Sequence, residues 1–139
     1  MTASQIEDAI VARLRDQLLE HITVEAAPED PGQYAVRGAK GCVLVRYTGS
    51  TYSPPEQLAV VQQRASQVTV LRGARSLRVK EGHQGVLEIM EAAIQALTLF
   101  NIEPGGWRKI YVQSDELIRE EKGVWWYGFT VIIPNDLYL

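Results

Sequence analysis

The segment Gly123–Ile133 constrains the fold of this chain more than any other, because its side chains sort into two faces. A strand places successive side chains on opposite sides of its sheet. The even positions are mixed, but Trp126 and Ile132 are too apolar for a face in plain contact with water. The odd positions are all apolar or aromatic and predict a core-facing side: Trp125, Tyr127, Phe129, Val131 and Ile133.

The even face of this strand and the end of the chain form the candidate subunit interface. The chain ends on Leu137, Tyr138 and Leu139, whereas a free terminus is usually polar and frayed. Aromatic residues are enriched at the centres of interfaces. Two helices that cover both faces of a small sheet would explain the same pattern without a partner. If the interface interpretation is right, Trp126→Asp breaks assembly and spares the fold; otherwise it unfolds the monomer.

Two amphipathic helices are predicted from apolar residues spaced three or four positions apart. The first covers Ile6–Leu19 and follows a capping box at Ser4–Glu7. The second opens at Gly82 or Gln84 and carries its apolar stripe over Val86–Leu97. It stops before the Pro and Gly residues of 101–106.

The remaining pattern predicts short strands and two polar connections. Thr48–Glu56 is rich in Gly, Pro and polar residues and predicts a mobile surface loop or arm. Asp115–Lys122 is charged and predicts a long acidic connection between the last two strands. The predicted strands are Ile22–Glu25, Gly41–Tyr47, Val68–Leu71, Trp107–Gln113 and Gly123–Ile133. We therefore expect one α+β domain over residues 1–139, with two main helices packed on a single small, mostly antiparallel sheet.

Composition excludes several classes of protein. With 46% apolar and 22% charged residues, the 139-residue chain is typical of a globular domain and not of a disordered one. A net charge of −3 with interspersed signs argues against specific nucleic-acid binding. No apolar run approaches the roughly 20 residues of a membrane span, and the amino terminus does not look like a signal peptide. We expect synthesis in the cytosol and no membrane contact.

The sequence predicts no catalytic, metal-binding or cofactor-binding residue. Cys42 lies inside an apolar run and is expected to be a buried small hydrophobe. His21 and His83 have no second ligand at metal-binding spacing. Gly82 and Gly85 lack the Lys and Ser/Thr of a phosphate loop. Glu120–Lys122 matches the E-x-K end of metal-dependent nucleases, but chance explains it better because it falls in a predicted connection.

One modest basic cluster precedes the second helix and contains Arg72, Arg75, Arg78 and Lys80. Arginine suits bidentate contacts with carboxylates. The cluster is either a solvated loop or a surface that faces acidic residues of a neighbouring copy, such as those of Asp115–Glu121. Arg72, Arg75 and Arg78 therefore join Trp126, Ile132 and Leu137–Leu139 as interface candidates.

The assembled pattern resembles the tail terminators of Mu-like contractile-tailed bacteriophages and related prophages. The resemblance rests on the opening helix Ile6–Leu19, the Arg-containing segment Val68–Arg75, the helix Val86–Leu97 and the closing segment Glu121–Tyr127. It implies a structural tail protein that forms a ring, commonly of six copies, on the tail tube. The implied ring stops tube and sheath elongation and joins the tail to the neck.

The implied partners are further copies of the chain, the tail tube protein, the tail sheath protein and a neck or head-completion protein. The implied location is the tail of the virion, and the resemblance carries over no site residue. Two other classes of function remain open from the sequence. One is a head–tail connector or neck protein, and the other is a small intracellular enzyme or ligand-binding domain. Solution size and tube-capping ability separate these three.

Overall fold

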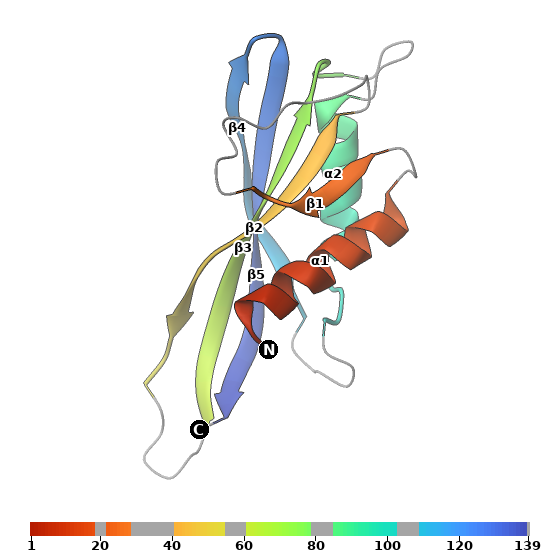
Figure 1. Ribbon diagram of the computed structural model, residues 1–139. Helices are drawn as coiled ribbons and strands as arrows, with labels where there is room; N and C mark the ends of the chain where they lie inside the picture. Colours follow the sequence, from red (N-terminus) through yellow and green to blue (C-terminus); the bar gives the residue numbers. More distant parts are fainter. Residues whose placement is uncertain (19–21, 29–40, 55–60, 79–84, 103–108, 139) are drawn as a thin grey trace.

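The computed structural model describes residues 1–18, 22–28, 41–54, 61–78, 85–102 and 109–138 (Figure 1). The helices are α1 (Ala3–Gln17) and α2 (Val86–Leu97). The strands are β1 (Thr23–Ala26), β2 (Cys42–Tyr52), β3 (Val61–Ala74), β4 (Tyr111–Glu121) and β5 (Val124–Tyr138). They form one sheet in the order β1-β2-β3-β5-β4, in which β1 and β2 are parallel and all other neighbours antiparallel. The predicted α+β class with a mostly antiparallel sheet is confirmed.

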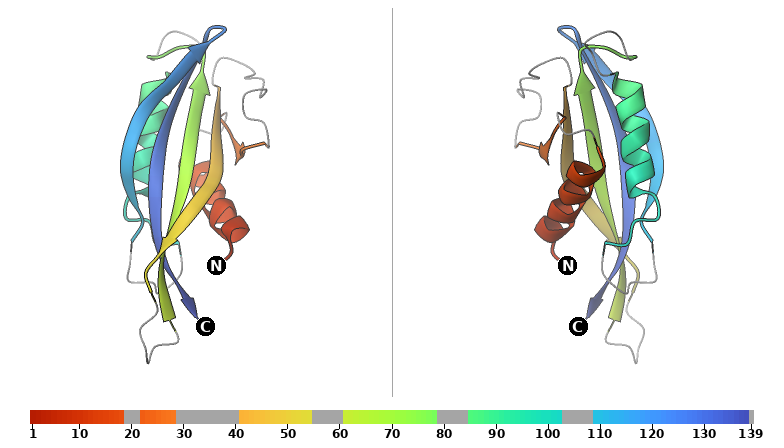
Figure 2. Two further views of the ribbon diagram at one scale, coloured as in Figure 1. Left: turned by 90° about the vertical axis from the view of Figure 1, so that its left-hand side faces the viewer. Right: turned by 90° about the vertical axis from the view of Figure 1, so that its right-hand side faces the viewer.

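Both helices pack on the same face of the sheet, which we call the helix face (Figure 2). The main core lies between them and alternate residues of the strands. From β5 it takes Phe129, Val131 and Ile133, three of the odd positions that the alternation assigned to the core. Because α1 and α2 share one face, the alternative arrangement with one helix on each face is wrong.

The capping box of helix α1 begins at Thr2, two residues earlier than predicted. The hydroxyl of Thr2 accepts from the backbone N–H of Gln5 at 3.1 Å, and the Gln5 side chain accepts from the Thr2 N–H at 2.8 Å. This reciprocal pair satisfies two N–H groups that have no partner within the helix. Glu7, predicted to complete the box with Ser4, instead accepts from the backbone N–H of Tyr47 at 2.7 Å.

Strand β2 extends through a segment that was expected to be a loop. Thr48–Tyr52 continues β2 and pairs with β3 after a bulge between Tyr47 and Gly49, so the predicted arm is wrong for these residues. Gly49 has φ +143°, a backbone conformation that other residues rarely adopt, which explains how a Gly-containing polar stretch continues the strand. Residues 55 and 56 of the predicted arm lie outside the described part of the chain.

The acidic connection Asp115–Lys122 was also predicted wrongly. Strand β4 continues to Glu121, and only Lys122 and Gly123 separate it from β5. Both turn residues have positive φ, 53° and 80°, as a type I′ hairpin turn requires. Because β4 is an edge strand and nearly all of its side chains are exposed, it accommodates charged residues that a central strand would exclude.

Candidate interaction surfaces

The face of the sheet opposite the helices, called here the second face, has its own apolar cluster. Cys42, Leu44 and Trp126 form its buried centre, and Leu71 and Val124 pack against it. The indole of Trp126 lies directly over Gly73 on the paired strand, where an added Cβ would be 2.6 Å from the ring. A glycine at this position is therefore what allows the large ring to lie close to the sheet.

The predicted interface residues of β5 are mostly buried within their own chain. Trp126 is 7% exposed and Ile132 is 9% exposed, so neither offers the free apolar surface that the alternation suggested. Leu137 is half-buried at the end of β5, opposite Gln62. Tyr138 belongs to β5, but its side chain, like Leu139, lies outside the described residues. A role of these residues in assembly stays a prediction.

The residues of the predicted basic cluster do not share one surface in the structure. Arg72 is buried on the helix face and is not a surface residue. Its guanidinium donates to the carbonyl oxygens of Cys42 and Gly73, at 3.3 and 3.4 Å, and to that of Gly85, the residue that caps α2, at 3.5 Å. Burial lowers the pKa of Arg72 to about 10. Arg75 and Arg78 are exposed, and Lys80 lies outside the described residues.

Cys42 is buried, as the sequence predicts. Burial raises the pKa of its thiol to about 11, against the smaller opposing effect of Arg72. A thiol with so high a pKa is protonated at neutral pH and is a poor nucleophile. Among the described residues no group of three or more His, Cys, Asp and Glu side chains is placed to hold a metal ion. His21 and His83 lie outside the described part of the chain.

Strand β4 carries exposed large apolar residues on both of its faces, which sequence reasoning missed. Tyr111, Leu117 and Ile118 of β4 are 48%, 49% and 42% exposed. Ile118 lies at a bulge and packs over Gly128 of β5, on the second face. The signal in the sequence was the Lys122–Gly123 dipeptide. If it is taken as a two-residue turn, the preceding charged segment becomes a strand and these apolar residues lie along its edge.

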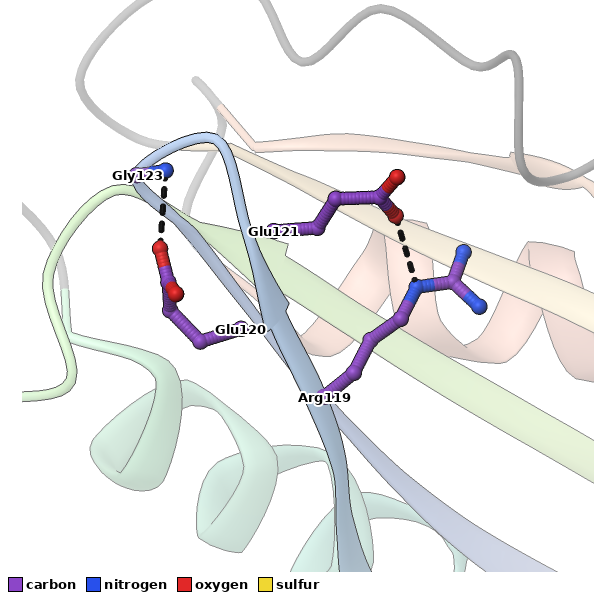
Figure 3. Close-up of polar contacts among 4 residues, drawn as sticks. All are labelled: Arg119, Glu120, Glu121 and Gly123. Carbon is purple, nitrogen blue, oxygen red and sulfur yellow. Dashed lines mark hydrogen bonds and ion pairs between the residues drawn. The ribbon is translucent and has the colours of Figure 1, made fainter.

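The tip of this hairpin is charged, and two of its acidic side chains make polar contacts (Figure 3). Glu120 accepts from the backbone N–H of Gly123 at 2.9 Å, and Arg119 pairs with Glu121 at 3.0 Å. Glu120 and Glu121 are thus the last residues of a strand, and Lys122 is the first residue of a turn. The reason given for setting aside the E-x-K triplet as a nuclease signature, its position in a long connection, was therefore wrong, and its lack of a catalytic role stays a prediction.

The end of the sheet opposite the hairpin tip holds a polar cluster around Arg64 of β3. Arg64 is 8% exposed. It donates to the hydroxyls of Ser50 and Tyr47, each at 3.1 Å, and to the carbonyl oxygen of Met1 at 3.2 Å. The hydrogen bond between Tyr47 and Ser50, with a smaller effect of Arg64, lowers the pKa of the Tyr47 phenol.

No helix of the described part is long and apolar enough to cross a membrane.

Comparison with known proteins gives one family match. The model of the family described as Gp37 protein matches residues 10–135, from the middle of α1 nearly to the end of β5. No curated protein matches the chain significantly. The family match covers β1 to β4 and most of β5, including the β4–β5 hairpin and Arg64 itself.

Proposed function

The chain belongs to the Gp37 protein family, a phage-associated family, and from this premise we propose that it is a structural protein of a phage tail. In this proposal several copies, six as in the tail terminators that the sequence resembles, form a ring on the end of the tail tube. The ring stops the elongation of tube and sheath and joins the tail to the neck. This role needs no catalytic step, no cofactor and no specific contact with nucleic acid.

The observation that supports assembly is the set of exposed apolar residues along β4. Tyr111, Leu117 and Ile118 lie on an edge strand with their side chains about half exposed. Several large apolar side chains exposed along one unpaired strand edge are a candidate site of protein–protein contact. A ring also needs a second, different patch on each subunit, because neighbours in a ring meet head to tail. The exposed Arg75 and Arg78 and the polar end around Arg64 are candidates for that second patch.

Assembly is tested first with the purified chain, by light scattering and negative-stain electron microscopy. We expect rings of uniform size, alone or after addition of the tube protein encoded in the same genome. Deletion of the gene from a producing phage or prophage should give tails of uncontrolled, excessive length. Monomers that never cap tubes, together with tails of normal length in the deletion, would overturn the proposal. Tails of normal length that fail to join heads would instead identify a neck connector.

A further inference from the structure

Strand β2 has an unpaired edge at its carboxyl end. Strand β1 pairs with residues 42–45 of β2, and Glu7 of α1 accepts from the next outward N–H, that of Tyr47, at 2.7 Å. Beyond this point the described residues contain no strand on the outer side of β2, while its inner side stays paired with β3 as far as Tyr52. Residues 50–53 contain no charge, no proline and no bulge. They therefore lack the features that usually keep a strand edge from pairing.

Strand β4 forms the opposite edge of the same sheet (Figure 2). Two bulges, after Val112 and after Leu117, interrupt it, and residues 114–117 between them pair regularly with β5. This regular stretch is four residues long, the length over which β1 pairs with β2. Strand β4 carries four carboxylates and one arginine, whereas Arg46 is the only charged residue of β2. Two β4 edges would oppose like charges, but the edge of β2 offers β4 a neutral strand with one cation.

We infer that residues 114–117 of β4 pair with residues 50–53 of β2 in the next copy, so that the sheet continues from subunit to subunit. The inference rests on the proposed ring and names the contact that closes it. Strands β2 and β5 run in one direction and β4 runs in the other, so copies related by rotation about one axis bring β4 and β2 together antiparallel. The two edges are different surfaces, as a ring requires.

The alternation of the two strands fixes the register of this pairing. Ser53 donates its backbone N–H to β3 at 3.1 Å, so Ser50 and Tyr52 direct their backbone groups away from β3. Along β4 the same alternation directs Asp115 and Leu117 away from β5. All four of these outward residues have their side chains on the helix face. The register Ser50↔Leu117 and Tyr52↔Asp115 therefore joins outward backbone groups and keeps each face of the sheet continuous.

This register also covers two large apolar side chains that a single subunit leaves exposed. Tyr52 is 50% exposed and Leu117 is 49% exposed. They would lie diagonally across the new strand pair, which is within reach of an aromatic side chain. On the second face the same register brings Glu121, at the end of β4, toward the exposed Arg46. Apolar contact and opposite charge thus favour the same pairing.

The offset between the two paired segments agrees with closure into a ring. Ser50 lies level with Ile133 of β5 through its pairing with β3, whereas Leu117 lies level with Tyr127. Neighbouring copies are therefore displaced by six residues, about 20 Å along the strands, over a width of about 19 Å for β2, β3, β5 and β4. These lengths correspond to a strand tilt of about 45°, at the upper end of the roughly 35–45° found in closed barrels.

The first test joins the two strands with a disulfide. Thr51 and Glu116 are exposed and lie opposite one another in this register, with Cα atoms about 4.5 Å apart, which a disulfide can span. We expect Thr51→Cys/Glu116→Cys, in a Cys42→Ala background, to give covalent oligomers on mild oxidation, seen on a denaturing gel without reductant. Thr51→Cys/Ser114→Cys is the matched control, because its cysteines would be diagonal, about 7–8 Å apart, and beyond disulfide reach.

The second test removes one backbone donor from the edge of β2. Tyr52→Pro removes the outward N–H of Tyr52 and leaves the hydrogen bonds between β2 and β3 in place. Tyr52→Ala is the control, because it removes the same side chain and keeps the N–H. We expect Tyr52→Pro to need at least tenfold more subunit than Tyr52→Ala for half-assembly, measured by analytical ultracentrifugation. Circular dichroism checks that both variants fold, and if Tyr52→Pro does not, the disulfide test decides.

The outcomes separate this contact from the ring itself. If the wild type forms rings but Thr51→Cys/Glu116→Cys cross-links no more than its control, the inference is overturned and the ring proposal stands. Equal assembly of folded Tyr52→Pro and Tyr52→Ala has the same meaning. Covalent dimers of the single variant Thr51→Cys would also overturn the inference, because they would show β2 paired with a second β2. A wild type that never assembles overturns the proposed function.

Discussion

At the scale of single residues, Cys42 gives a direct measure of how closed the second face is. Its thiol is buried beside Leu44 and Trp126, and burial raises its pKa to about 11 from an ordinary value of 9.0. We expect the native thiol to react with a disulfide reagent at pH 8 far more slowly than the thiol of the denatured chain. Equal rates in both states would show that the second face is open to solvent.

The same thiol makes stability depend on pH. Below pH 9 it is protonated in the folded and unfolded states and has no effect on the balance between them. Between pH 9 and 10 the unfolded thiol ionises while the folded thiol stays protonated, so the free energy of unfolding should fall. Above pH 10 the lowered pKa of Arg72 acts in the opposite direction. Cys42→Ala should remove this fall, as measured by urea denaturation at pH 8, 9 and 10.

Gly73 and Trp126 form the tightest contact of the second face. Gly73→Ala places a methyl group against the indole, and we expect the free energy of unfolding to fall by about 1–3 kcal/mol. Gly128→Ala is the matched control with a smaller loss, because its Cβ would meet only the ends of the Leu71 and Ile118 side chains, at 3.2 and 3.3 Å. In a Trp126→Leu background, Gly73→Ala should lose most of its effect.

Burial also changes the expected outcome of Trp126→Asp. The alternation alone predicted loss of assembly with an intact fold, which needs a tryptophan on a free surface. In the structure a carboxylate at this position would lie in the cluster of Cys42 and Leu44. We now expect Trp126→Asp to unfold the monomer, seen as loss of the far-ultraviolet circular dichroism signal. A folded variant would show that the second face tolerates charge.

At the scale of elements, the two-residue turn between β4 and β5 decides whether the hairpin forms. Lys122 has φ +53°, which Asn and Gly adopt more readily than Lys, so Lys122→Asn should raise the melting temperature. Gly123→Ala should lower the free energy of unfolding by about 1 kcal/mol through backbone strain alone, since no atom lies within 4 Å of its added Cβ. A lower melting temperature for Lys122→Asn, or an unchanged or higher free energy of unfolding for Gly123→Ala, would argue against this turn geometry.

The same elements show what could be predicted from sequence. The helices and the core face of β5 were predictable because their apolar spacing is regular over many residues. Two strand segments could not be predicted. A bulge lets the polar residues of Thr48–Tyr52 continue β2, and an exposed sheet edge accommodates the charged residues of Asp115–Glu121 in β4. The buried position of Arg64 depends on Tyr47 and Ser50 of a neighbouring strand, and no local pattern carries that information.

At the scale of the whole molecule, the exposed apolar residues of β4 should control assembly without controlling the fold. Leu117→Lys and Ile118→Lys place a charge on half-exposed positions, so we expect normal melting but a loss of rings. Leu99→Lys is the control, because Leu99 is an even more exposed apolar residue just beyond α2. Assembly is measured by light scattering. If the Leu117→Lys and Ile118→Lys variants assemble as well as the Leu99→Lys control, these hairpin residues do not lie in the interface.

The unbroken ladder between β3 and β5 has a mechanical consequence. It pairs fourteen residues of each strand without a bulge, from Val61↔Tyr138 to Ala74↔Trp125. Its hydrogen bonds run perpendicular to the strands. A pull that enters at the start of β3 and leaves through the hairpin tip at the start of β5 therefore strains these bonds together, in shear, instead of opening them one at a time. The subunit should therefore resist tension along the length of this ladder.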